Sequence, residues 1–150
     1  MQVNSIGYLR AVPLEKPAPP RPDRWPAYLD IALRERIVPN GFTHRADEDV
    51  EADWSKYGQS GPREIDDCVE FLALLPRVAQ AKRGSYGLKH VAEEWAGMYV
   101  CNGALLIAAY YAGVRVVRCG GKSPNGVLAI GASSRWPEHV RERIPSYMVY

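Results

Sequence analysis

Apolar residues recur at helical spacing in four stretches of this 150-residue chain. The pattern predicts helices over residues 26–37, 62–83, 85–97 and 103–112. Pro76 falls inside the second stretch and is expected to kink that helix or to end its first segment near Leu75. These four elements form the predicted helical core of the chain.

The last two predicted helices are the centre of the expected fold. Gly84 is expected to end the preceding helix in a left-handed conformation, and Ser85 to cap the helix that follows. Asn102 is expected to cap the helix over residues 103–112. This helix carries no charge on any side, which is typical of a buried helix. Its alanines form a small-residue stripe along which a second helix can pack closely: Ala104, Ala108 and Ala112.

After Gly113 the hydrophobic period shortens to that of a strand. Residues 114–117 and 127–130 are rich in β-branched side chains, and a turn-rich segment separates them. A β-hairpin with a long tip is therefore predicted, followed by a short helix from Trp136 to about Arg143. The expected fold class is α+β and mostly helical.

The segments before and between the helices are less regular. Residues 1–12 alternate loosely and can form an edge strand. Residues 13–26 hold six of the twelve prolines, which indicates an extended arm over residues 1–25, ahead of a single domain over residues 26–150. Residues 43–61 are acidic, and a solvated loop or a short surface helix is expected there. Within the arm, Arg24 and Trp25 are candidate partner-binding residues, because Arg and Trp dominate the energetics of many interfaces.

Charge is divided unevenly along the chain. Residues 1–75 hold 9 Lys and Arg against 13 Asp and Glu, a net charge of −4, whereas residues 76–150 hold 10 against 4, a net charge of +6. A basic half can attract nucleic acid or an acidic protein surface. The basic candidates for such contacts are Lys82, Arg83, Lys89, Arg115, Arg118 and Lys122.

Several other site classes are disfavoured. Three widely spaced cysteines and three histidines do not stand at zinc-site intervals, so no metal or cofactor is expected. Free thiols without a signal peptide favour a reducing cytoplasm. Residues 95–114 carry no charge over 20 positions, but glycines and Asn102 interrupt them, so a membrane span is not expected.

One catalytic arrangement can be assembled from the sequence. Cys101 stands just before a helix, where the helix dipole lowers the pKa of a thiol, and His90 is a candidate base. Nothing in the sequence brings these two residues together. The alternative is that Cys101 packs as a small apolar residue and His90 lies on a solvated helix face.

The strings SYGLKH (85–90) and YVCNGALLIAA (99–109), with a glutamate between them at 93 or 94, are followed by Gly113 and by Pro124-Asn125. This pattern over residues 85–130 resembles a group of small proteins of proteobacterial phages, plasmids and other mobile elements, mostly without an assigned activity. In that group the position of Cys101 does not demand a thiol. The resemblance implies an accessory role: binding to a host machine, a defence complex or nucleic acid.

The preferred hypothesis is therefore a non-enzymatic accessory protein that attaches to a larger nucleoprotein or host-defence assembly, as anti-defence and anti-CRISPR proteins do. One alternative is a nucleic-acid-binding module that uses the basic half. The other is a cysteine-dependent enzyme with Cys101 and His90.

Overall fold

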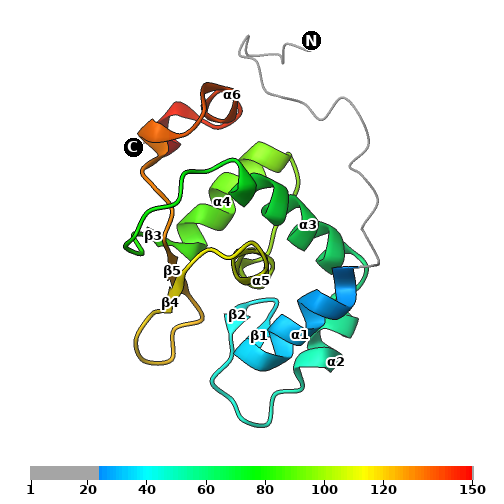
Figure 1. Ribbon diagram of the computed structural model, residues 1–150. Coiled ribbons are helices and arrows are strands. Elements are labelled where there is room, and N and C mark those ends of the chain that lie inside the picture. The colour runs from blue at the N-terminus through cyan, green and yellow to red at the C-terminus, as the bar shows by residue number, and fades with distance from the viewer. Residues whose placement is uncertain (1–23, 150) are drawn as a thin grey trace.

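The computed structural model describes residues 24–149 and shows an α+β protein that is mostly helical (Figure 1). The predicted edge strand, and the arm as far as residue 23, lie outside the described residues. The main helices are α1 (Trp25–Glu35), α2 (Val50–Tyr57), α3 (Ser60–Ala73), α4 (Ser85–Ala96), α5 (Asn102–Tyr111) and α6 (Glu138–Arg141). The strands are β1 (Ile37–Val38), β2 (Gly41–Phe42), β3 (Arg83–Gly84), β4 (Val116–Arg118) and β5 (Gly126–Leu128).

Helix α5 occupies the centre of the molecule, as its uncharged sequence predicts. Residues 102–109 are all buried, and α5 packs most extensively on α3 while also contacting α1, α4 and the strands β1, β2 and β4. In Figure 1 it is seen nearly end-on, with α3 and α4 above it and α1 below. Ala104 and Ala108 of the predicted stripe have no exposed surface. The hydrophobic core is one continuous cluster around this helix, and it extends from Tyr28 to Ile144.

Helix α3 ends close to Leu75, where Pro76 was expected to end its first segment, and no helix continues over residues 76–83. Its last residue is Ala73, because Pro76 cannot continue a helix and also disfavours helical geometry in the residue before it. The chain then extends, and Lys82 donates its backbone N–H to Leu128 O at 2.9 Å. Lys82 and Arg83 therefore do not lie in the last turn of a helix, and Arg83 belongs to β3.

Strand β3 turns the predicted hairpin into a three-stranded antiparallel sheet. The hairpin itself is confirmed, since Val116 of β4 pairs with Leu128 of β5. On the other side of β5, Arg83 pairs with Leu128 and Gly84 with Val127. Gly84 has φ −64° and is extended rather than left-handed, which corrects the expectation for this residue. Strands β1 and β2 form a separate two-residue hairpin after α1, which the sequence did not indicate.

Two predicted caps have other roles. Ser85 is fully buried, and its hydroxyl accepts the backbone N–H of Gly126 at 3.0 Å, so it ties α4 to the sheet. At the start of α5 the capping acceptor is Cys101 Sγ, 3.4 Å from Ala104 N, and Asn102 is already inside the helix.

Asn102 and Gly103 instead form a junction between three segments. The Asn102 amide donates to Asn40 O, Pro124 O and Asn125 Oδ1 at 3.1–3.3 Å, and Gly103 N–H donates to Pro39 O at 2.9 Å. A Cβ on Gly103 would lie 2.0 Å from Val38 O. We call this contact between the β1–β2 turn, the start of α5 and the loop before β5 the Asn102 junction.

The acidic segment over residues 43–61 contains α2, which is not a purely surface helix. Asp49 caps it by accepting Ala52 N–H at 3.0 Å. Trp54 points inward and is buried, with its indole N–H donating to Ile37 O at 2.8 Å. At the other end of the chain, α6 is shorter than the predicted helix over residues 136–143.

Candidate functional site

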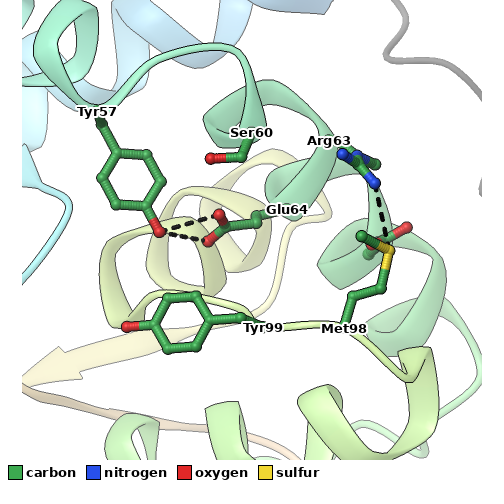
Figure 2. Close-up of a pocket in the computed structure, with 7 residues that line it drawn as sticks. Tyr57, Ser60, Arg63, Glu64, Met98 and Tyr99 are labelled. Atoms are coloured by element: carbon green, nitrogen blue, oxygen red, sulfur yellow. Dashed lines mark hydrogen bonds between the residues drawn. The ribbon is translucent and has the colours of Figure 1, made fainter.

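A pocket opens where α2 ends, α3 begins and the corner between α4 and α5 passes (Figure 2). Its cavity volume is about 230 Å³. Helix α3 supplies one wall through residues three or four positions apart, which lie on one helix face: Ser60, Arg63, Glu64 and Asp67. Tyr57 closes one side from the end of α2, and Met98 and Tyr99 come from the corner.

Glu64 is the buried centre of this pocket, with only 6% of its surface exposed. Both of its carboxylate oxygens lie 2.9 Å from the Tyr57 hydroxyl, and Oε1 also accepts the backbone N–H of Cys101 at 2.7 Å. Glu64 thus links α2, α3 and the residue before α5. In Figure 2 its carboxylate faces the Tyr57 hydroxyl, with Ser60 above it and the Tyr99 ring below.

The pocket wall is short of positive charge. Within residues 24–149, no Lys or Arg forms an ion pair with Glu64 or Asp67. Arg63, the cation of the wall, places Nη1 3.3 Å from Met98 Sδ. Two carboxylates and one guanidinium therefore leave the wall with a formal charge of −1 when all three are ionised.

Burial and like charge perturb the acids of this region. Burial first, and then the neighbouring Glu70, raise the pKa of Asp67 to about 6, although Arg63 opposes the shift. Burial, the Cys101 sulfur and the hydrogen bond to Glu64 raise the pKa of Tyr57, so its hydroxyl stays protonated and donates. The pocket therefore concentrates negative charge in a partly desolvated place.

Next to the pocket lies a surface that we call the tyrosine patch, made of Tyr86, His90 and Tyr99. Tyr86 and Tyr99 are 56% and 62% exposed. The Lys89 ammonium lies 5.6 Å from the centre of the Tyr86 ring and 4.7 Å from that of Tyr99, so both rings border one cation. Because Tyr99 also lines the pocket, patch and pocket form one continuous surface.

Lys89 is buried and fixes this region from inside. It forms a 2.7 Å ion pair with Glu93 and donates to Val100 O at 3.2 Å. Burial alone would raise the pKa of Glu93, but hydrogen bonds from Lys89 and His90 lower it. Lys89 therefore holds the α4–α5 corner, and with it Tyr99, instead of projecting toward a ligand.

The other basic candidates are divided among separate internal contacts. Arg83 is buried, with its guanidinium 5.0 Å from the centre of the Trp136 ring. Arg118 donates to Glu35 O and lies 4.1 Å from the centre of the Phe42 ring, and Arg115 donates to Ala79 O at 3.1 Å. Lys82 and Lys122 are exposed.

The two candidates from the arm meet different parts of the core. The Arg24 guanidinium lies 5.5 Å from the centre of the Tyr111 ring. Trp25 packs edge-on against Trp54, with 6.4 Å between ring centres. The structure therefore does not bring Arg24 and Trp25 together with Lys89, and it places both of them at the start of α1.

Cys101 has the opposite electrostatics to those expected from its place before α5. Burial and the Glu64 carboxylate raise the pKa of its thiol to about 12, despite the hydrogen bond from Ala104 N–H. The imidazole of His90 is paired with Glu93 Oε2 at 3.1 Å and stacks edge-on against Tyr86. The expected lowering of the thiol pKa is therefore wrong, because burial, and after it the Glu64 carboxylate, outweigh the hydrogen bond at the start of α5.

The sequence did not predict that Tyr57, Glu64, Asp67 and Tyr99 would meet in one pocket. Glu64 and Asp67 stand one turn apart, and Glu64 directly precedes the buried Ile65. Two acidic residues one helical turn apart, beside a buried position, were the signal in the sequence that could have indicated this site. Nothing local indicated that Tyr57 and Tyr99 would face the same carboxylate.

Compared with protein-family models, with curated proteins and with solved structures, the chain matches none. Over residues 24–149, no helix combines the length and the apolar character needed to cross a bilayer. The uncharged run over residues 95–114 is broken between α4 and α5. In the same part of the chain, no three His, Cys, Asp or Glu side chains gather as metal ligands.

Proposed function

We propose that this chain is a non-enzymatic binding protein that holds a protein partner against the pocket and the tyrosine patch. The observation that carries the proposal is the continuity of the two through Tyr99: an acidic cavity opens beside exposed, pre-positioned aromatic rings. An accessory role in a phage or mobile element, on a nucleoprotein or host-defence assembly, rests on the resemblance over residues 85–130, and a place in the reducing cytoplasm rests on the free cysteines.

The tyrosine patch has the properties of an interface centre. Tyrosine gives a large amphipathic contact area with few rotatable bonds and is enriched among residues that dominate binding energy. Lys89 borders both rings, and its own position is set by Glu93 and Val100. Rings that are already positioned lose less conformational entropy when a partner binds.

The cysteine-dependent alternative receives less support from the site. A nucleophilic thiol must be available as the thiolate at neutral pH, and the raised pKa of Cys101 opposes this. The nucleic-acid alternative is supported by the exposed Lys82 and Lys122. A salt-dependent gel shift that Lys82→Ala and Lys122→Ala abolish together would favour nucleic acid over a protein partner.

The proposal is tested by affinity capture from the native host. The full chain is compared with a Tyr86→Ala/Tyr99→Ala double variant and with Tyr147→Ala, which alters a 78% exposed tyrosine of the C-terminal segment. The double variant is expected to lose the captured partner, whereas Tyr147→Ala keeps it, with all melting temperatures close to the parent. Equal capture by both variants would exclude the tyrosine patch as the binding surface.

A further inference from the structure

We infer that the pocket accepts the cationic end of a basic side chain from the partner protein, with an arginine guanidinium as the best fit. This inference rests on the proposed function and names what the pocket contributes to it.

The first argument is the charge of the wall. Glu64 and Asp67 face the cavity, and in the described part of the chain neither has a Lys or Arg ion-pair partner. A carboxylate removed from water without a counter-ion is unfavourable, so an incoming cation relieves an existing cost. One such cation brings the formal charge of the wall, with Arg63, from −1 to zero. An anionic group would instead meet two carboxylates.

The second argument is spare hydrogen-bonding capacity. The Tyr57 hydroxyl has one proton, so at any moment it donates to only one of the two Glu64 oxygens. Cys101 N–H takes Oε1, which leaves Oε2 with unused acceptor sites. Asp67 and the Ser60 hydroxyl add further acceptors in the same cavity. A guanidinium brings five N–H donors and bonds carboxylates through two of them at once.

The third argument is the shape of the pocket. Figure 2 shows the Tyr57 and Tyr99 rings on two sides of the Glu64 carboxylate. Aromatic faces attract cations and stack well on the flat guanidinium. The volume of about 230 Å³ lies below the range of about 300–1,000 Å³ of pockets for drug-sized ligands. It suits the end of a side chain whose backbone lies on the neighbouring tyrosine patch.

The test uses small probes on the isotope-labelled full chain, followed by amide chemical shifts. Nα-acetyl-arginine amide is expected to shift the amides of Ser60, Glu64, Tyr99 and Cys101 in a saturable way. Nα-acetyl-citrulline amide, which has the same shape without the charge, is expected to leave them unchanged. 1,4-Diaminobutane distinguishes a free amine from a side chain, and is expected to bind more weakly than the arginine probe.

Variants locate the binding. Asp67→Asn is expected to weaken the arginine probe about tenfold, the usual effect of losing one charge-assisted acceptor. Tyr99→Ala removes a stacking wall and is also expected to weaken it. Glu51→Gln, a matched loss of an exposed carboxylate on α2, is expected to keep the affinity within about twofold.

Equal shifts from the arginine and citrulline probes, or none from either, would overturn the inference. If 1,4-diaminobutane binds more tightly than the arginine probe, the ligand of the pocket is a small amine and not a side chain of a partner protein. The proposed function is tested separately by the capture experiment. If the parent protein binds no arginine probe and the Tyr86→Ala/Tyr99→Ala double variant still loses the captured partner, the tyrosine patch remains the proposed binding surface and only the guanidinium inference fails.

Discussion

Two buried polar clusters meet the first turn of α5, and they differ in how closely the chain packs around them. At the Asn102 junction, the amide donates to three acceptors from two loops, and backbone packs so closely that a single Cβ on Gly103 has no room. At the pocket, the Glu64 carboxylate receives donors from Tyr57 and Cys101 but no cation from residues 24–149, and a cavity remains beside it. A closed cluster specifies a fold, whereas an open one can take a ligand.

The segment on which the expected resemblance rests, residues 85–130, covers the two clusters unequally. Ser85, Lys89, Asn102, Gly103 and Asn125 all belong to the resembling segment, and each makes an internal hydrogen bond. The four pocket residues on α3 lie before residue 85, outside that segment. That segment therefore holds the framework around α5 and the tyrosine patch, but not the α3 wall of the pocket.

The largest effect on stability is expected from adding a side chain at Gly103 in the Asn102 junction. Gly103→Ala would place a Cβ 2.0 Å from Val38 O. The atoms that it meets are backbone atoms of Val38 and Pro39, which cannot rotate away as a flexible side chain can. We expect a loss of at least about 3 kcal/mol in the free energy of unfolding, measured by urea denaturation. Gly87→Ala is the matched control, because its Cβ meets nothing within 4 Å inside α4. It should instead stabilise by about 0.5–1 kcal/mol. Similar curves for both variants would disprove the close packing of the junction.

A smaller effect is expected from removing the donor at the same place. Asn102→Ala leaves the carbonyls of Asn40 and Pro124 without their amide partner. The expected loss is about 1–3 kcal/mol, the cost of unsatisfied buried acceptors. Among the residues that the structure describes, none hydrogen-bonds the Asn102 oxygen itself, so the donor side of the amide should account for the loss. Asn102→Asp, which keeps the shape and replaces the donor with charge, should be at least as damaging in the same assay.

Removing a charge from the pocket should stabilise the protein, in contrast to the losses expected at the Asn102 junction. Because folding raises the pKa of Asp67 to about 6, the native state holds this proton more strongly than the unfolded chain does. The stabilising contribution is therefore present below the unfolded pKa of about 4 and is lost as the pH rises through about 6.

Asp67→Asn is thus expected to raise stability at pH 7 by at most about 1 kcal/mol, since solvent screens a half-buried group. The gain should shrink toward pH 4, where the parent carboxyl is itself protonated. Melting temperatures of both proteins between pH 4 and pH 8 measure this. Glu142→Gln, at an exposed carboxylate of the C-terminal segment, is the control and should show no such trend. A destabilised Asp67→Asn at pH 7 would mean that the carboxylate is satisfied after all.

The smallest effect on stability is expected at the exposed rim. Tyr99→Ala removes a 62% exposed ring and one cation–π contact with Lys89. We expect a change within about 0.5–1 kcal/mol by urea denaturation. A much larger loss would show that Tyr99 is part of the framework and would blur the distinction between the two clusters.

Much of the fold can be predicted from local pattern, and the site cannot. The helices near residues 25–35, 85–96 and 102–111 and the β4–β5 hairpin follow from hydrophobic period and glycine punctuation. Strand β3 was missed because Lys82 and Arg83 resemble a helix C-terminus, and only the partner β5 makes them extended. The pocket depends on Tyr57, Glu64 and Tyr99 meeting across 42 positions of sequence. No local preference of these residues encodes that encounter.

The central place of α5 has a consequence for synthesis on the ribosome. Helices α1, α2 and α3 emerge first, yet the surfaces they bury are completed by a helix that begins at residue 102, by the strands that follow it and by a C-terminal segment that contributes core residues as far as Ile144. Until those elements are synthesised, the apolar faces of the three helices remain exposed to solvent. Exposed apolar surface is bound by chaperones and promotes aggregation. A nascent chain arrested near residue 100 should therefore remain protease-sensitive. One arrested with residue 144 beyond the exit tunnel should become protected in a single step.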